Sequence, residues 1–147
     1  MIHLRPARST DAGKIGAILT EFAATTDWMP DLHTGAEDIA HAGGMIDLGW
    51  VTVAEVQGAV CGFAARDGDE LNALYVAQSH RGQGVGSALL EDQMSRTKTL
   101  SLWTFEANGP AQDFYRKHGF REVERTDGAG NDENLPDIRL EWRREAN

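Results

Sequence analysis

Residues 76–90 read VAQSHRGQGVGSALL. The apolar residues before this loop predict the end of a strand, and the apolar residues from Val85 onward predict a helix that begins at once. At such a junction several backbone N–H groups have no helical partner, and the helix dipole adds partial positive charge. Glycines let those N–H groups approach an anion without an intervening side chain. The segment therefore predicts an anion site and favours a pyrophosphate as its ligand.

Two other nucleotide-binding motifs fit this loop poorly. The phosphate loop of nucleoside-triphosphate enzymes needs Gly-Lys-Ser/Thr, a tripeptide that the chain does not contain. The dinucleotide fold needs G-x-G-x-x-G, and the third position counted from Gly82 and Gly84 is Ser87. Glu106 does lie about 20 residues past the loop, where that fold has a ribose-binding acid. However, only one helix is predicted downstream, which is too few for the repeated strand–helix–strand units of that fold.

The rest of the chain predicts a mixed α/β sheet with helices on its faces. A first helix follows the capping residues 9–11, and a second starts at a capping box formed by Thr34 and Glu37 and should end or be interrupted at Gly43-Gly44. Two further helices are predicted at 84–96 and, capped by Asn108, at 108–118. The predicted strands are 2–6, 50–56, 59–66, 70–76, 99–105, 120–125 and 138–143.

Length and composition indicate one ordinary globular domain, residues 1–147, with 41% hydrophobic and 25% charged residues. The only cysteine, Cys61, excludes an internal disulfide, and the histidines show no metal-ligand spacing, so we expect no metal. No apolar stretch approaches the ~20 residues of a membrane span, and no signal peptide is recognisable, so we expect a cytoplasmic protein without a membrane partner. A formal charge of −9 disfavours nucleic acid as a partner.

Two motifs carry a resemblance to a known family. Residues 81–86, Arg-Gly-Gln-Gly-Val-Gly, resemble the Q/R-x-x-G-x-G/A motif of the GCN5-related N-acetyltransferases (GNAT). Residues 108–120 resemble the family's N-x-x-A-x-x-F-Y-x-x-x-G-F pattern, in the expected order and spacing. The resemblance implies a single α/β domain with a mixed, mostly antiparallel sheet of six to seven strands. In that sheet the central strands splay apart, and acetyl-CoA lies in the wedge between them.

The resemblance also implies roles for particular residues. Backbone groups of residues 74–76 would pair with the pantetheine arm like an added strand, and the glycine loop would hold the pyrophosphate. Asn108 would bind the pantetheine arm, and it also suits a helix N-cap. The implied acetyl-CoA-binding residues are Leu74, Tyr75, Val76, Arg81, Gly82, Gln83, Gly84, Val85, Gly86, Ser87 and Asn108.

Tyr115 and Glu106 are the candidate catalytic residues. Tyr115 matches the family tyrosine that protonates the departing CoA thiolate, although an aromatic residue packed beside Phe114 and Phe120 is the alternative. Glu106 is the candidate general base by position, with Glu70 and Asp69 behind it. A water chain instead of a carboxylate, or a merely solvated Glu106, remains open.

The acceptor is less well indicated. The resemblance places it between residues 28–33 and 125–137, and the second region carries Asp127, Asp132, Glu133 and Asp137. These carboxylates either hold an amine or belong to a solvated loop.

The predicted activity is acetyl transfer from acetyl-CoA to a primary amine, on a small molecule or a peptide, by direct attack through a tetrahedral intermediate. The alternative is a non-catalytic acyl-CoA-binding or regulatory module. A homodimer is also expected, since family analogy and the apolar Ile138-Leu140-Trp142 face of the last strand favour a partner.

Overall fold

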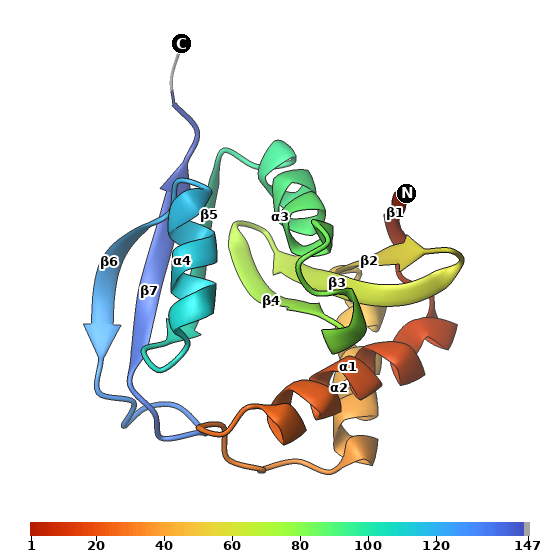
Figure 1. The fold of residues 1–147 in the computed structure, drawn as a ribbon. Coiled ribbons are helices and arrows are strands. Elements are labelled where there is room, and N and C mark those ends of the chain that lie inside the picture. The colour runs from red at the N-terminus through yellow and green to blue at the C-terminus, as the bar shows by residue number, and fades with distance from the viewer. Residues whose placement is uncertain (146–147) are drawn as a thin grey trace.

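The structure, a computed structural model, describes residues 1–145. Seven strands form one sheet in the order β1-β2-β3-β4-β5-β7-β6, and only β4 and β5 are parallel neighbours (Figure 1). The strands are β1 (Ile2–Pro6), β2 (Val51–Val56), β3 (Ala59–Asp67), β4 (Glu70–Val76), β5 (Thr99–Phe105), β6 (Arg121–Thr126) and β7 (Asp137–Arg143). The predicted mixed, mostly antiparallel sheet is therefore confirmed.

Four α-helices cover the two faces of this sheet: α1 (Ala12–Thr25), α2 (Gly35–Asp47), α3 (Val85–Ser95) and α4 (Gly109–Lys117). One buried cluster, with Ile15 and Phe63 at its centre, lies between α1, α2 and the first strands. The second, which contains Leu89, Leu100 and Leu140, lies beneath α3 and α4 on the other face. Within residues 1–145 no helix is long and apolar enough to span a membrane.

Short-range signals set the helix starts as predicted. The Thr34 hydroxyl accepts from the Glu37 N–H at 3.1 Å, and the Thr34 N–H donates to the Glu37 carboxylate at 2.9 Å. The Asn108 side chain accepts from the Ala111 N–H at 3.1 Å. Each bond satisfies a backbone group that the first turn of a helix leaves without a partner.

The predicted end of the second helix at Gly43-Gly44 is wrong, because α2 continues to Asp47. A glycine within a helix costs about 0.5–1 kcal/mol relative to alanine. Ala42 and Met45, on either side of the pair, are buried against α1 and the sheet. Burial of a side chain such as that of Met45 contributes about 1.5–3 kcal/mol, which offsets the cost of the two glycines.

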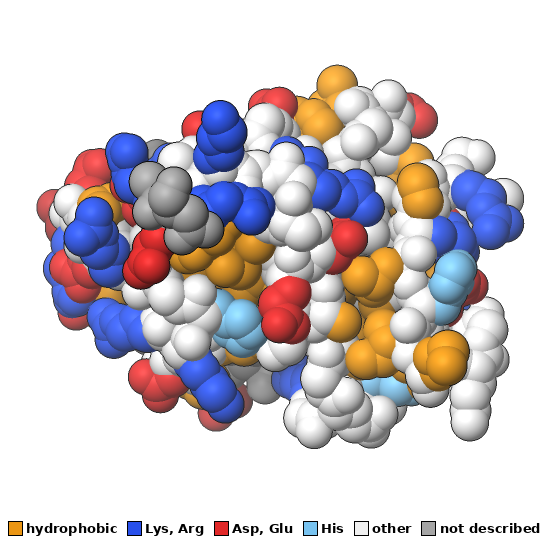
Figure 2. Space-filling model, turned by 90° about the horizontal axis from the view of Figure 1, so that it is seen from above, with side chains coloured by type: hydrophobic (Ala, Val, Ile, Leu, Met, Phe, Trp, Pro, Cys, Tyr) orange, Lys and Arg blue, Asp and Glu red, His pale blue; other side chains and the backbone are white. Residues whose placement is uncertain are grey.

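The apolar face of the last strand is not a surface for a partner, which corrects the interpretation made from its alternation. Ile138 and Leu140 have no exposed area, and Trp142 packs partly buried against the same cluster. Because α4 lies over this face, the alternating pattern reports burial within the chain. On the face seen in Figure 2, Lys and Arg side chains lie mainly over one half of the view, with Asp, Glu, hydrophobic and uncharged side chains between them.

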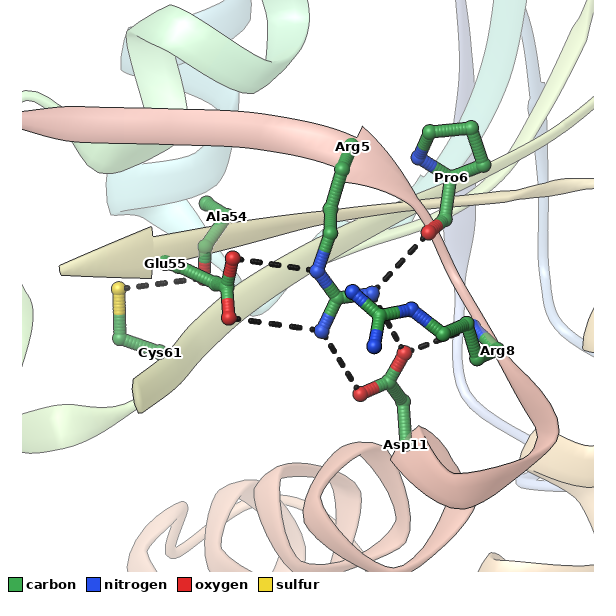
Figure 3. Close-up of polar contacts among 7 residues, drawn as sticks. All are labelled: Arg5, Pro6, Arg8, Asp11, Ala54, Glu55 and Cys61. Carbon is green, nitrogen blue, oxygen red and sulfur yellow. Dashed lines mark hydrogen bonds and ion pairs between the residues drawn. The ribbon is translucent and has the colours of Figure 1, made fainter. Parts of the chain in front are cut away.

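A partly buried ion-pair cluster joins β1, β2 and the start of α1 (Figure 3). The Arg5 guanidinium donates to Asp11 at 2.8 and 3.0 Å and to Glu55 at 3.1 Å. Asp11 also accepts from the backbone N–H of Arg8 at 2.7 Å. These bonds to Arg5 hold the pKa of Asp11 below its ordinary value.

The crossing of α1 and α2 leaves no space for a side chain at Gly16. A Cβ atom there would lie 2.7 Å from the Cα atom of Ile39, whereas a Cβ at Gly13 meets nothing within 4 Å. We expect Gly16→Ala to destabilise the protein by about 1–3 kcal/mol through overpacking. Gly13→Ala, the matched control in the same helix, should be neutral or stabilising by up to about 1 kcal/mol. Chemical denaturation measures both changes, and equal stabilities for the two variants would contradict the close crossing.

The Arg5–Asp11 pair predicts a defined pH dependence. Since the native pKa of Asp11 is lowered, its contribution to stability is complete above the unfolded pKa of about 4 and is lost as the pH falls through the native pKa. Asp11→Asn should lower the free energy of unfolding at pH 7 by about 1–2 kcal/mol. This difference should shrink toward pH 3, as followed by denaturant titrations at each pH. The exposed Asp31→Asn serves as the control, and a difference for Asp11→Asn that is independent of pH would argue against the pair.

Candidate active site

The centre of the sheet opens between β4 and β5. The two strands pair only at Glu70 and Ser101, where the Ser101 N–H donates to the Asp69 carbonyl at 2.9 Å. Beyond this point they separate, and a cleft of about 90 Å³ lies between them. Its lining comes from β4, β5, α1 and α4, and comprises Phe22, Leu71, Asn72, Ala73, Leu74, Tyr75, Leu102, Trp103, Thr104, Phe105, Asn108, Ala111 and Tyr115. The expected splay is thus present.

The hydrogen-bond pattern of β4 shows which of its backbone groups face this opening. The Ala77 N–H donates to the Cys61 carbonyl at 2.7 Å, directly beside the register pair Gly62–Val76. In an antiparallel ladder this identifies a non-hydrogen-bonded pair, so the N–H and carbonyl of Val76 point away from β3. Leu74, two residues earlier, has the same orientation. The main chain of Tyr75 is directed at β3 instead, although the residue is among those that line the cleft.

The same argument applies to β5. The Arg144 N–H donates to the Lys98 carbonyl at 2.8 Å, and the Glu106 N–H donates to the Pro136 carbonyl at 2.9 Å, at the two ends of the β5–β7 ladder. The backbone groups of Trp103 and Phe105 therefore point away from β7 and toward β4. The carbonyls of Val76 and Phe105 accept from Arg81 and Gln112, so the main-chain donors and acceptors left for a ligand include those of Leu74 and Trp103. Such groups on both walls suit a ligand rich in amides.

The glycine loop lies at the end of β4 that borders the opening. Gly82 and Gly84 have φ angles of +76° and +85°, the left-handed region that favours glycine. Gly84 is the N-cap of α3, and its carbonyl accepts from the Ala88 N–H at 3.0 Å. The N–H groups of the first turn of α3 therefore have no partner within the helix. No heavy atom lies within 4 Å of a Cβ built at Gly84, so there is room for an anion.

Two side chains hold this loop in place. Arg81 Nε donates to the Val76 carbonyl at 3.2 Å, and the Glu21 carboxylate of α1 accepts from the Gln78 N–H at 2.7 Å. The Val85 side chain is buried in the core, so this residue offers a ligand only its backbone.

Tyr115 lies on α4 with its side chain buried and facing the cleft. Its ring packs edge-on against Phe114 and Phe120, with centroids 5.2 and 5.5 Å away. Burial raises the pKa of Tyr115 above its ordinary value, so the hydroxyl is protonated at neutral pH. Tyr115 therefore packs in the core and also borders the cleft.

The geometry disfavours Glu106 as a general base. Its carboxylate accepts from Arg125 at 2.8 Å, and Glu106 is not among the residues that line the cleft. Glu70, the next candidate, forms two bonds to Arg139 at 2.6 and 2.7 Å. Both carboxylates are thus engaged by arginine side chains, and neither lines the cleft.

A second cavity of about 470 Å³ adjoins the cleft and shares Trp103, Thr104 and Phe105 with it. Its other wall is formed by the connection between β6 and β7 and by the two strand residues that flank it, and consists of Thr126, Gly130, Asn131, Glu133 and Asp137. The connection between α1 and α2 reaches the same end, because Trp28 packs against Phe105 with ring centroids 5.6 Å apart.

The two regions predicted for the acceptor are thus brought together at one end of the sheet. Phe22, Trp103 and Phe105 were not predicted as site residues. Buried and more exposed residues alternate along β5, which indicates a strand with two different faces. This pattern does not indicate that the strand borders a cleft.

Comparisons with known proteins agree with this geometry. A family model described as an acetyltransferase (GNAT) domain matches residues 47–122. The peptidyl-lysine N-acetyltransferase YjaB of Escherichia coli (strain K12) is 30% identical over 129 residues, which are 86% of this chain and 87% of that protein. The solution structure of the apo form of Escherichia coli YjaB superposes with a TM-score of 0.82 at 24% identity and covers 99% of both chains.

The structure of yncA from Salmonella typhimurium with its cofactor acetyl-CoA superposes with a TM-score of 0.74 at 19% identity, and covers 100% of this chain and 96% of that one. The family model spans more than half of the chain, and the seven-stranded sheet has the same fold as these structures. The chain therefore belongs to the GNAT acetyltransferase family and is an N-acetyltransferase.

Proposed function

We propose that this protein transfers the acetyl group of acetyl-CoA to the side-chain amine of lysine in a peptide or protein. The observation that carries the proposal is the continuity of three features: the glycine loop, the cleft with unpaired backbone groups, and the second cavity. The curated relatives named peptidyl-lysine N-acetyltransferases support lysine as the acceptor. The formal charge of −9 also favours a cationic acceptor over an anionic one.

The chain's own residues provide a place for each part of acetyl-CoA. The N–H groups at the start of α3 and the adjacent loop, residues 81–87, bind the pyrophosphate. The backbone of Leu74 pairs with the amides of the pantetheine arm, and Asn108 lines the same cleft while it caps α4. The thioester then lies near the wide end of the cleft, between Tyr115 and Phe105.

The chemistry at this point is direct attack of the amine nitrogen on the thioester carbonyl, without an acyl-enzyme. Cys61 is buried in the core and is no nucleophile. The N–H of Val76 points away from β3, on the side where β4 and β5 separate, and stabilises the oxyanion of the tetrahedral intermediate. Tyr115 donates its proton to the CoA thiolate as the carbon–sulfur bond breaks, and solvent, rather than Glu106, takes the proton of the amine.

The acceptor class is tested with three amines: a lysine-containing peptide, a polyamine and a free amino acid. Each is incubated with acetyl-CoA, and release of the CoA thiol is followed together with the mass of the product. We expect the lysine peptide to gain one acetyl group on its side chain with the highest kcat/KM. Preference for either small amine would contradict the proposed acceptor.

Tyr115→Phe isolates the acid from the packing of the ring. Turnover should fall by ~10²-fold or more, because the leaving thiolate loses its proton donor. The affinity for acetyl-CoA and the melting temperature should change little, since the buried apolar area is the same. Steady-state kinetics at saturating substrates check this, and turnover within threefold of the parent would remove Tyr115 from the mechanism.

Gly84→Val tests the anion site. The side chain would occupy the space that we assign to the pyrophosphate, so binding of acetyl-CoA in calorimetry should be lost. The positive φ adds a strain of about 1–2 kcal/mol whether or not ligand is present. Gly58→Val is the matched control, since Gly58 has a φ of +78° in the β2–β3 turn and open space around its Cβ. If both variants bind acetyl-CoA like the parent, the loop does not hold the pyrophosphate.

A further inference from the structure

Four carboxylates lie in the connection between β6 and β7 and at the first residue of β7, and their surroundings differ. Asp137 accepts from the Thr126 hydroxyl and from the Asn131 amide, and Asp127 accepts from the Ala129 N–H at 3.0 Å. These two residues therefore fix the shape of the loop. Asp132 is exposed to solvent and lines neither cavity.

Glu133 is the fourth carboxylate, and it lies half-buried on the wall of the second cavity. Across the hydrogen bonds and ion pairs of residues 1–145, none involves the Glu133 side chain, whereas the oxygens of Asp137 on the same wall are engaged. A carboxylate withdrawn from water without a cation loses hydration that nothing replaces. The Glu133 carboxylate can therefore accept hydrogen bonds from a cation that enters this cavity.

Glu133 also stands near the point where the second cavity meets the cleft. Burial, and then the negative charge of Glu133, raise the pKa of Tyr75, whose side chain lines the cleft. The aromatic residues Trp103 and Phe105 border both spaces. An acceptor chain that passes through the second cavity therefore brings its end group past Glu133 toward the thioester.

We propose that Glu133 binds the ammonium group of the incoming lysine side chain and so selects cationic primary amines as acceptors. The three N–H donors of the ammonium suit a carboxylate, and the methylene stem packs against Trp103 and Phe105. The inference rests on the proposed function, since it requires a lysine acceptor. Glu133 acts here in acceptor binding and positioning, and the proton transfers at the reaction centre are assigned to other groups.

Glu133→Gln removes the charge and keeps the size of the side chain. With a lysine peptide as acceptor, its KM should rise tenfold or more, while kcat stays within threefold and the KM for acetyl-CoA is unchanged. Asp132→Asn is the matched control, because it makes the same change of charge at the next residue of the same loop. It should behave like the parent enzyme.

A second measurement separates recognition of charge from a change in the loop. Binding of the lysine peptide and of the same peptide with an Nε-acetylated lysine is measured by calorimetry in the presence of CoA. Glu133→Gln should weaken the binding of the charged peptide only, whereas a change in the structure of the loop would weaken the binding of both peptides.

Equal KM values for the two variants, or equal losses for the two peptides, would overturn the role of Glu133 and leave the proposed function intact. A parent enzyme that acetylates no lysine peptide would overturn the proposed function and this inference with it.

Discussion

The single backbone pairing between Glu70 and Ser101 is the constraint on which the cleft depends. Side chains reinforce it from the neighbouring strand, because Arg139 of β7 binds Glu70 with two short bonds and lies 5.4 Å over the Trp103 ring. Beyond this pair, β4 remains paired with β3 and β5 remains paired with β7, and β4 and β5 no longer pair with each other. Main-chain groups of Leu74 and Trp103, which would otherwise pair across the sheet, remain open to solvent or ligand. Left buried without a partner, each would cost about 1–3 kcal/mol, so an amide-rich ligand that replaces water here gains specificity from the register of the sheet.

The ends of the two walls are also fixed by side chains. Glu21 of α1 holds the main chain at Gln78, where β4 leads into the glycine loop. On the other wall the buried Gln112 amide donates to the carbonyls of Phe105 and Glu106, at 3.1 and 2.8 Å. The cleft is thus bounded by contacts between elements that are distant in the chain, and its width is a property of the assembled sheet.

The same assembly sorts the charged residues by role. Glu106 and Glu70 form ion pairs with arginines, and Asp137 stabilises the loop that precedes it by accepting from Asn131. Glu133 differs from these because its position directs it to a cavity. The net charge of the chain is compatible with a cationic acceptor in general, whereas the position of Glu133 on the cavity wall is the reason we propose this carboxylate for it.

The features that the sequence determined by itself depend on residues close together in the chain. The capping box at Thr34, the cap at Asn108 and the glycine loop each consist of residues that lie within a few positions of one another. Two motifs, at the starts of α3 and α4, were enough to indicate the GNAT family. The tertiary structure decided the outcomes that depend on distant partners. Packing carried α2 through Gly43-Gly44, and α4 covered Ile138 and Leu140. Arg125 engaged Glu106 across 19 positions of sequence, and the β6–β7 connection brought Glu133 beside the cleft. Such contacts form between segments whose separation in space is set by the whole sheet, and for this reason local sequence patterns do not contain them.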